Sequence, residues 1–479
     1  IKLTSPHYAA LVQPEPLKLH QIQVQLLDDN SLLLEYMLGD ERSYVWAVTR
    51  TEVSSFELPG RLEIEQTARR LHSLLTARLP RRDETTDQRQ QRVVESDSQL
   101  PNETESLSRL LLGSIRDKLD KKRVLVVPDG ALQYIPFQVL TVTTDTRSHD
   151  PNEVKANDKG DNRIPLIFDH EIINQPSAST LALVLSETAK RKPAANTVAI
   201  LADPVFEADD PRVKLPNKDT TSALASSVPS KIAEAFRDVN FDGLKIPRLL
   251  ASREEAEGIM AVIPQGTGLK ALGFEASRST VATKDLDQYR IVHFATHGVL
   301  DNENPELSGI VLSLFDQEGR PQDGFLRLHD IYNLNLPVDL VVLSACNTGL
   351  GKDVKGEGLI GLTRGFMYAG AGGVVASLWK VDDDATAELM RHFYEALFKK
   401  GMSPSEALRE SQLAMRRQPR WQAPYYWAGF VLQGQYDQKE SMTGPSLRIR
   451  ERLAELIIIT GVLTGAAFLV LRRRRKGAK

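Results

Sequence analysis

Two residue types that together cleave acyl bonds, a histidine and a cysteine, follow two similar apolar segments. The segment 291–297, Ile-Val-His-Phe-Ala-Thr-His, ends at His297, and the segment 340–346, Leu-Val-Val-Leu-Ser-Ala-Cys, ends at Cys346. Cys346 is the only cysteine of the chain, so a thiol nucleophile has no rival. A thiol attacks a carbonyl carbon as the thiolate, which a neighbouring imidazole generates near neutral pH. The pair therefore predicts acyl transfer, most simply peptide-bond hydrolysis.

Such a reaction also needs donors for the oxyanion and a proton for the leaving amine. Gly298 follows the histidine and lets the backbone turn sharply, so its N–H and that of Cys346 are the predicted oxyanion donors. His297 can act first as general base and then as general acid. This chemistry requires no cofactor, and we expect none.

Simpler interpretations exist for these residues. A cysteine after a Val-Val-Leu run is often a small buried core residue, and a histidine at a strand end is often a core group. His293 and His297 have a spacing that could bind a metal, but the segment is strand-like and no third ligand is close in sequence, so we expect no metal. Glycines at 349–361 lack the Gly-Lys-Ser/Thr ending of a phosphate loop, which argues against a nucleotide site.

Three consecutive aspartates follow another apolar segment, Ser-Leu-Trp-Lys-Val at 377–381. Asp382, Asp383 or Asp384 could line the pocket for the substrate side chain, where a carboxylate would favour Arg or Lys. The alternative is that they cap the helix that begins there and complement its dipole.

Composition excludes several other classes of protein. The net charge of −3 and the lack of a basic stripe with interleaved aromatic residues argue against nucleic-acid binding. One cysteine allows no internal disulfide and no cysteine pair for zinc. This composition is consistent with a reducing compartment.

The chain alternates predicted strands with predicted helices over its C-terminal two-thirds. Apolar runs predict strands at 123–128, 198–202, 373–379 and 426–432, in addition to the two that end in the clusters at His297 and Cys346. Helical patterns fall between them, at 107–119, 254–262, 279–286, 356–370, 383–400 and 403–416. This alternation favours an α/β fold with a largely parallel sheet flanked by helices on both faces.

The N-terminal part has a different pattern. Three alternating segments within 18–50 predict a small antiparallel β meander, and a helix is expected at 61–79. The charged stretch that follows predicts a linker or solvated loop, and 143–163 predicts a surface insertion. We therefore expect these parts in order: 1–80, the meander with its helix; 81–106, a polar linker; 107–434, the main domain; and 435–452, a second linker.

Residues 453–471 are almost entirely apolar and precede the basic tail 472–479. Nineteen helical residues extend roughly 28 Å, enough to cross a bilayer core, and the segment lacks the polar stripe of a buried soluble helix. We therefore expect a transmembrane helix and a single-pass membrane protein. The basic tail would lie in the cytoplasm, so the globular part would lie outside and need an export signal ahead of Ile1. A tail anchor with the globular part inside is the alternative.

Five ordered motifs resemble the CHAT family of caspase-like domains, which are related to separase and caspases. They are HFATHG at 293–298, LSACNTG at 343–349, GEGLIGLTRGFMYAG at 356–370, SLWKVDDDAT at 377–386 and PYYWAGFVLQG at 424–434. The resemblance extends back to VLVVPDGALQYIPFQVL at 124–140. It implies a caspase-like fold with a His297–Cys346 dyad, oxyanion donors at Gly298 and Cys346, and a specificity pocket beside 377–386.

This resemblance implies a cysteine endopeptidase that acts on a protein or peptide substrate, and with the apolar segment 453–471 we expect it to be membrane-anchored and regulated by a partner or by processing. The alternative is a membrane-tethered interaction or signalling module with little or no turnover. Two features depart from the family pattern. The tetratricopeptide repeats usual upstream, which could bind a regulatory protein partner, are not in this sequence, and a terminal membrane span is not a general feature of the family.

Overall fold

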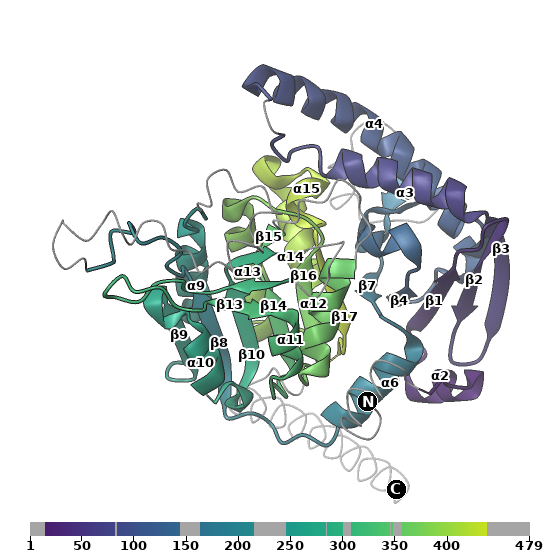
Figure 1. Cartoon of the computed structure of the whole chain (residues 1–479). Coiled ribbons are helices and arrows are strands. Elements are labelled where there is room, and N and C mark those ends of the chain that lie inside the picture. The colour runs from purple at the N-terminus through teal and green to yellow at the C-terminus, as the bar shows by residue number, and fades with distance from the viewer. Residues whose placement is uncertain are drawn as a thin grey trace, which may run out of the picture.

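The structure is a computed structural model in which eight ranges of the chain are described. They are residues 15–81, 84–143, 163–214, 246–283, 285–299, 308–344, 346–347 and 357–437. These ranges form a mixed α/β fold around one large sheet (Figure 1).

The large sheet has 11 strands within the described residues. They are β1 (Ser31–Met37), β2 (Arg42–Val48), β3 (Val53–Pro59), β4 (Arg123–Val127), β7 (Glu171–Asn174), β8 (Asn196–Ala202), β9 (Gly268–Leu272), β10 (Tyr289–Ala295), β14 (Leu340–Leu343), β16 (Gly373–Ser377) and β17 (Phe430–Gly434). Their order across the sheet is β3-β2-β1-β4-β7-β17-β16-β14-β10-β8-β9. Neighbours run parallel except at β2–β3, β1–β2 and β16–β17.

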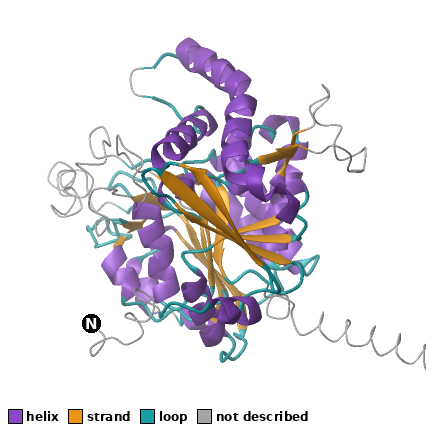
Figure 2. Ribbon diagram, turned by 90° about the vertical axis from the view of Figure 1, so that its right-hand side faces the viewer, coloured by secondary structure: helices purple, strands orange, loops and turns teal. Residues whose placement is uncertain are grey.

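Helices lie on both sides of the strands (Figure 2). They are α2 (Leu19–Gln25), α3 (Arg61–Leu75), α4 (Thr86–Leu112), α6 (Ala178–Thr188), α9 (Leu250–Val262), α10 (Arg278–Thr283), α11 (Leu328–Tyr332), α12 (Glu357–Tyr368), α13 (Asp383–Phe398), α14 (Pro404–Arg417) and α15 (Pro424–Trp427). Helix α13 packs against both α9 and α14, and α11 packs against α12.

The central strands are apolar because both of their faces are covered. Every residue of β14 and of β16 is buried, and β10 is buried from its second residue onward. Strands covered on both faces need continuous apolar runs instead of alternation. This packing fixes where β10 and β14 end, and thereby where the residues that follow them lie.

A second, four-stranded sheet begins where β10 and β14 end. Its strands are β11 (His297–Val299), β12 (Gly309–Val311), β13 (Phe325–Arg327) and β15 (Cys346–Asn347), in the order β13-β12-β11-β15. A further pair, β5 (Thr141–Thr143) and β6 (Arg163–Pro165), is antiparallel. The chain leaves β10 at Ala295 and enters β11 at His297, so the second sheet continues directly from the large one.

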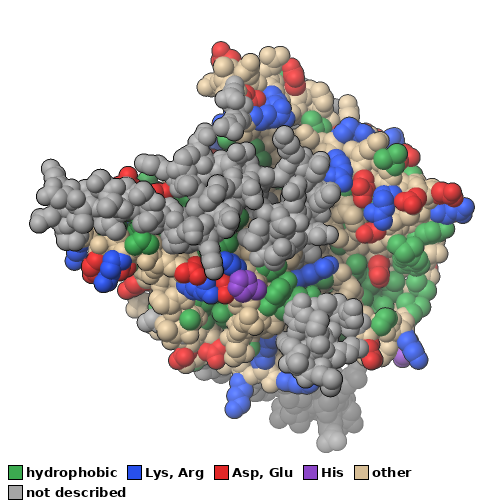
Figure 3. Space-filling view, in the orientation of Figure 1, with side chains coloured by type: hydrophobic (Ala, Val, Ile, Leu, Met, Phe, Trp, Pro, Cys, Tyr) green, Lys and Arg blue, Asp and Glu red, His purple; other side chains and the backbone are tan. Residues whose placement is uncertain are grey.

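The predicted N-terminal meander is not a separate layer. Strand β1 pairs in parallel with β4, so β1–β3 form one edge of the large sheet. The first alternating segment is the helix α2, and β3 supplies the third strand instead. Apolar side chains gather over this edge in Figure 3, where Met37 and Val53 are 51% and 42% exposed.

The predicted polar linker at 81–106 is also wrong. Most of it belongs to α4, whose N-cap Thr85 forms a capping box with Gln88. Glu, Gln and Arg favour helices, and α4 packs against α3 with its C-terminal half, which buries Leu107 and Leu111. Its composition is polar because much of its surface faces water.

The expected membrane anchor is corrected as well. No helix within the described ranges is both long and apolar enough to cross a bilayer. The segment 453–471 and the tail 472–479 lie outside these ranges, as do residues 144–162 of the predicted insertion. The structure therefore gives no support to a single-pass membrane protein, and we do not retain the transmembrane helix as part of the fold.

Candidate active site

The two candidate catalytic residues lie opposite each other on neighbouring strands. Strands β11 and β15 pair in parallel, with His297 in register with Cys346 and Gly298 in register with Asn347. Neighbouring strands are separated by roughly 4.8 Å. The large sheet thus brings together two positions that are far apart in the sequence, because β10 and β14 are themselves adjacent and parallel.

A single hydrogen bond fixes the tautomer of His297. Its side chain is 2% exposed, and Nε2 lies 2.7 Å from the carbonyl oxygen of Pro247. A carbonyl oxygen can only accept, so in the neutral ring Nε2 carries the proton and Nδ1 keeps its lone pair. Nδ1 is buried and has no hydrogen-bond partner among the described residues.

The surroundings of His297 keep the imidazole uncharged. Its pKa is lowered to about 4, mainly by burial and also by the charge of Lys380, while the hydrogen bond to Pro247 acts in the opposite direction. The ring of Phe206 packs against the imidazole, with centroids 5.1 Å apart. An uncharged imidazole with a free lone pair is the form that a general base requires.

His293 occupies a different environment, although it lies only four residues earlier. It is completely buried, with Nδ1 3.0 Å from the hydroxyl of Tyr394 and Nε2 3.0 Å from Oε1 of Glu255. The other carboxylate oxygen of Glu255 accepts a hydrogen bond from Ser344 at 3.0 Å. His293 therefore belongs to a buried polar network that connects β10 to α9, α13 and the end of β14.

Gly298 lies inside the second sheet. It pairs with Asn347 on β15 and with Ile310 on the opposite side, in β12. Its assignment as an oxyanion donor, like that of the Cys346 N–H, stays a prediction.

The three aspartates lie at the start of α13, and all are exposed. Asp382 is the N-cap residue, and its Oδ1 accepts from the Ala385 N–H at 3.0 Å. Asp384 pairs with Arg420 at 2.8 Å. The charge of Lys380, two residues before the cap, acts on His297. Capping is therefore observed for Asp382, whereas a role in substrate recognition for Asp382, Asp383 or Asp384 stays a prediction.

Sequence reasoning missed two residues that contact His297, Pro247 and Phe206, and a third, Asp203, that binds the arginine next to Pro247. Pro247 contributes only a backbone carbonyl, and Phe206 is one of many apolar residues, so neither carries a distinctive signal. Asp203 could have been found, because it directly follows the buried strand β8, which is adjacent to β10. Polar groups at such strand ends were the signal that identified His297.

Comparison with known proteins gives one match over most of the chain and two weaker relatives. The sequence model of the CHAT domain matches residues 101–435. Tetratricopeptide repeat protein 28 of Homo sapiens is 31% identical over 220 residues, and that of Mus musculus is 30% identical over 226 residues. Each alignment covers 39% of this chain and 9% of the relative, so the chain spans less than a tenth of these relatives.

Solved structures show a more distant similarity. The separase–securin complex of Saccharomyces cerevisiae matches with a TM-score of 0.47 and 11% identity, over 87% of this chain and 31% of the other. The Arg-specific cysteine proteinase gingipain R matches with a TM-score of 0.32 and 11% identity, over 70% of this chain and 67% of the other. Similarity at this level assigns neither a residue nor an activity to this chain.

Proposed function

This chain belongs to the CHAT-domain family, and from that premise we propose that it is a cysteine-type endopeptidase with a His297–Cys346 dyad. The observation that carries the proposal is the parallel register of these two residues, together with the buried, unpartnered Nδ1 of His297. A histidine that only filled the core would normally have both ring nitrogens paired or solvated.

The proposed reaction begins with transfer of the Cys346 thiol proton to Nδ1 of His297. The thiolate attacks the carbonyl carbon of the scissile peptide, and the backbone N–H groups of Gly298 and Cys346 donate to the oxyanion. The imidazolium then protonates the leaving amine as the C–N bond breaks. Water, deprotonated by Nδ1, hydrolyses the thioester and regenerates the thiol.

The low pKa of His297 makes this proton transfer a concerted event. A shift from 6.5 to about 4 disfavours the lone imidazolium by roughly 3 kcal/mol. A thiolate in contact with the ring would offset this penalty, because opposite charges stabilise each other strongly where water is excluded. We therefore expect the charged pair to form as a unit when substrate excludes water from the site.

Substrate recognition and regulation belong to the same proposal. Three acidic residues support a preference for Arg or Lys on the acyl side of the scissile bond. They are Asp382, Asp383 and Asp384, and they closely follow Lys380, whose charge acts on His297. The relatives' name refers to tetratricopeptide repeats, and such repeats would provide extended surfaces for a regulatory protein partner.

A peptide electrophile that alkylates thiols tests the dyad. We expect it to label Cys346, with the site identified by mass spectrometry, and to give no covalent adduct with the Cys346→Ala variant. His297→Ala should lower the labelling rate and the peptidase activity by about 10²–10⁴-fold. His329→Ala is the matched control, because the His329 side chain is 62% exposed and its Nε2 lies 3.4 Å from Asp330.

The competing interpretation, an interaction or signalling module with little turnover, predicts the opposite result. In that case the electrophile would leave Cys346 unmodified, with and without candidate partner proteins. Full activity of either dyad variant in purified form would show that the assignment of the dyad is wrong.

A further inference from the structure

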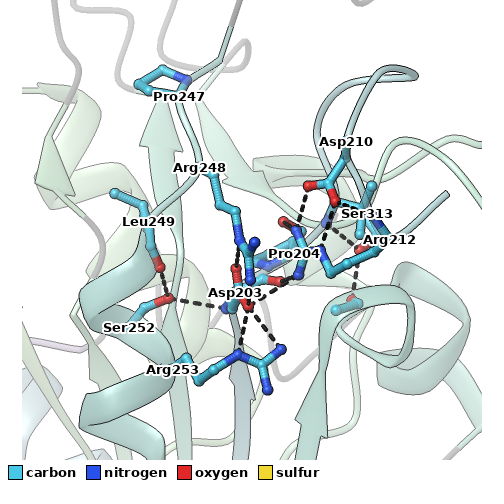
Figure 4. Close-up of polar contacts among 12 residues, drawn as sticks. Asp203, Pro204, Asp210, Arg212, Pro247, Arg248, Leu249, Ser252, Arg253 and Ser313 are labelled. Carbon is cyan, nitrogen blue, oxygen red and sulfur yellow. Dashed lines mark hydrogen bonds and ion pairs between the residues drawn. The ribbon is translucent and has the colours of Figure 1, made fainter.

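The turn that follows β8 brings a buried carboxylate together with three arginines. Asp203 is completely buried, and its φ of 50° lies in the left-handed region that residues other than glycine adopt infrequently. Oδ1 and Oδ2 of Asp203 each lie 2.7 Å from a nitrogen of Arg248. Arg253 and Arg212 approach Oδ2 at 2.8 and 3.0 Å. Figure 4 shows the three guanidinium groups converging on this carboxylate.

The burial of the Asp203 carboxylate and its left-handed φ would each disfavour folding if nothing compensated for them. A carboxylate loses its hydration on burial, and only well-formed ion pairs compensate for that loss. A left-handed φ at a residue with a Cβ adds backbone strain, and such strain is concentrated at functional sites. The cluster is connected to His297 through Arg248 and the neighbouring Pro247.

The cluster anchors the segment that contains Pro247, whose carbonyl accepts from Nε2 of His297 at 2.7 Å. On one side of the proline, the N–H of Ile246 donates to Oε1 of Glu207 at 2.8 Å. On the other side, the next residue is the arginine that binds both oxygens of Asp203. The carbonyl is therefore held between two anchors, and both anchoring carboxylates come from the turn 203–207.

The same turn is fixed in place and contacts the imidazole directly. Arg212 donates to the carbonyl oxygens of Asp203 and Pro204, at 2.8 and 3.2 Å. Phe206 packs against the ring of His297. One short turn thus controls the hydrogen-bond acceptor for Nε2 and one face of the imidazole.

We propose that Asp203 is a positioning residue for His297. By binding Arg248, it holds the Pro247 carbonyl where the carbonyl accepts from Nε2, and this keeps the lone pair of the neutral ring on Nδ1. The residue touches neither substrate nor the reacting atoms. Its kinetic consequence rests on the proposed peptidase function, but its effect on the tautomer of His297 does not.

The variant Asp203→Asn tests the proposal with little change in shape. Asparagine also tolerates a left-handed φ, so the substitution removes the charge and weakens the pairing with Arg248 while the backbone of the turn is retained. The control is Asp97→Asn. Asp97 lies on α4, and its Oδ1 and Oδ2 accept from Nη1 and Nη2 of Arg78 at 2.8 and 2.7 Å, so this variant removes a similar carboxylate–arginine pair outside the turn 203–207 and the Pro247 segment.

The tautomer can be measured directly by NMR of protein labelled with ¹⁵N in its nine histidines. The His297 signals are assigned from their loss in His297→Gln. We expect one tautomer, protonated at Nε2, in the wild type and in Asp97→Asn. In Asp203→Asn, we expect both ring nitrogens to move towards averaged shifts as the second tautomer is populated. An unchanged Nε2–H tautomer in Asp203→Asn would overturn the proposal.

Kinetics on a cleaved peptide give the second readout. We expect Asp203→Asn to lower kcat by about 10-fold or more with little change in KM, because a base in the wrong tautomer affects proton transfer and leaves substrate binding intact. If Asp203→Asn does not fold, Arg248→Gln takes its place, since it leaves Asp203 paired with Arg212 and Arg253. If the tautomer of His297 changes in Asp203→Asn but the wild type has no peptidase activity, the proposed function is contradicted and the role of Asp203 is supported. A wild-type tautomer and kcat in Arg248→Gln would contradict that role.

Discussion

At the scale of single residues, the fold holds two histidines uncharged, His297, which is buried, and His72, which is partly buried. Burial, together with the charge of Lys380, lowers the pKa of His297 to about 4. Loss of hydration, together with the charge of Arg69, lowers the pKa of His72 to about 4. The ring of His72 packs edge-on against the rings of Tyr134 and Trp379. In the unfolded chain both side chains would titrate near 6.5.

These pKa values predict that the protein loses stability in acid through its histidines. Between pH 6.5 and about 4 the unfolded chain binds a proton at each of these histidines while the folded chain does not, so the free energy of unfolding falls as the pH falls. For His297 alone, we expect roughly 2–3 kcal/mol to be lost between pH 7 and 4.5. Urea unfolding of His297→Gln should show a smaller loss than the wild type by that amount. An equal loss in both proteins would contradict the burial argument; His329→Gln should behave as the wild type.

Residue types and spacing identify His297 and Cys346 as candidates in the sequence, and the structure places these two positions in register on neighbouring strands, whereas their catalytic role stays a prediction. The details that determine how His297 works could not be predicted from its sequence neighbours. The acceptor for its Nε2 is a backbone carbonyl about fifty residues away, and a carbonyl carries no signal in the sequence. Asp203 could have been identified if the sequence had shown that β8 is adjacent to β10. The order of strands in a sheet depends on long-range pairing, which the local sequence pattern does not show.

At the scale of elements, the start of α13 shows how one run of aspartates can serve different purposes. Asp382 accepts from the Ala385 N–H and caps the helix, whereas Asp383 and Asp384 are exposed in the first turn. Capping requires a short polar side chain at one position only. The other two carboxylates lie in the first turn of α13, where they complement the helix dipole.

We therefore expect two measurements, of stability and of substrate preference, to distinguish the roles of the three aspartates. Asp382→Ala should lower the free energy of unfolding by about 1 kcal/mol through loss of the cap, and Asp382→Asn should restore most of it because asparagine caps equally well. Profiling cleavage over a peptide library should show a preference for Arg or Lys that is weakened in Asp383→Ala or Asp384→Ala. If the preference for Arg or Lys is unchanged in Asp382→Ala, Asp383→Ala and Asp384→Ala, these residues only stabilise α13.

Elements with strong internal periodicity were predictable, and those that depend on tertiary pairing were not. The buried runs of β4, β8, β10, β14 and β16 are visible in the sequence because a parallel strand must be apolar throughout. The short strands β11 and β15 have no pattern of their own and form only because β10 and β14 bring them side by side. Helix α4 was missed because its polar composition resembles that of a linker, although its residues favour helices.

At the scale of the whole molecule, the large sheet unites parts of the chain that the sequence suggests are separate. Strand β1 contributes Leu32, Leu33 and Leu34, each at most 1% exposed, to the same apolar core as β10 and β14. Strands β1–β3 therefore form one edge of the sheet that also contains β10 and β14, the strands that precede His297 and Cys346. The family match begins at residue 101 and so leaves out this edge.

This continuity predicts that a core substitution in β1 destabilises the entire fold. Leu33→Ala should lower the free energy of unfolding by about 2–5 kcal/mol, since it removes a buried leucine side chain and leaves a cavity. Met37→Ala on the same strand is the matched control, because Met37 is 51% exposed and its truncation should change stability by no more than about 0.5 kcal/mol. Urea unfolding should be followed by tryptophan fluorescence and, in parallel, by hydrogen exchange of the backbone amides of β14, which lies at the centre of the large sheet. If β1–β3 belong to the same cooperative unit as β14, Leu33→Ala shifts both signals together to lower urea. A shift of the fluorescence alone, with the β14 amides protected as in the wild type, would show that the N-terminal strands unfold as a separate unit.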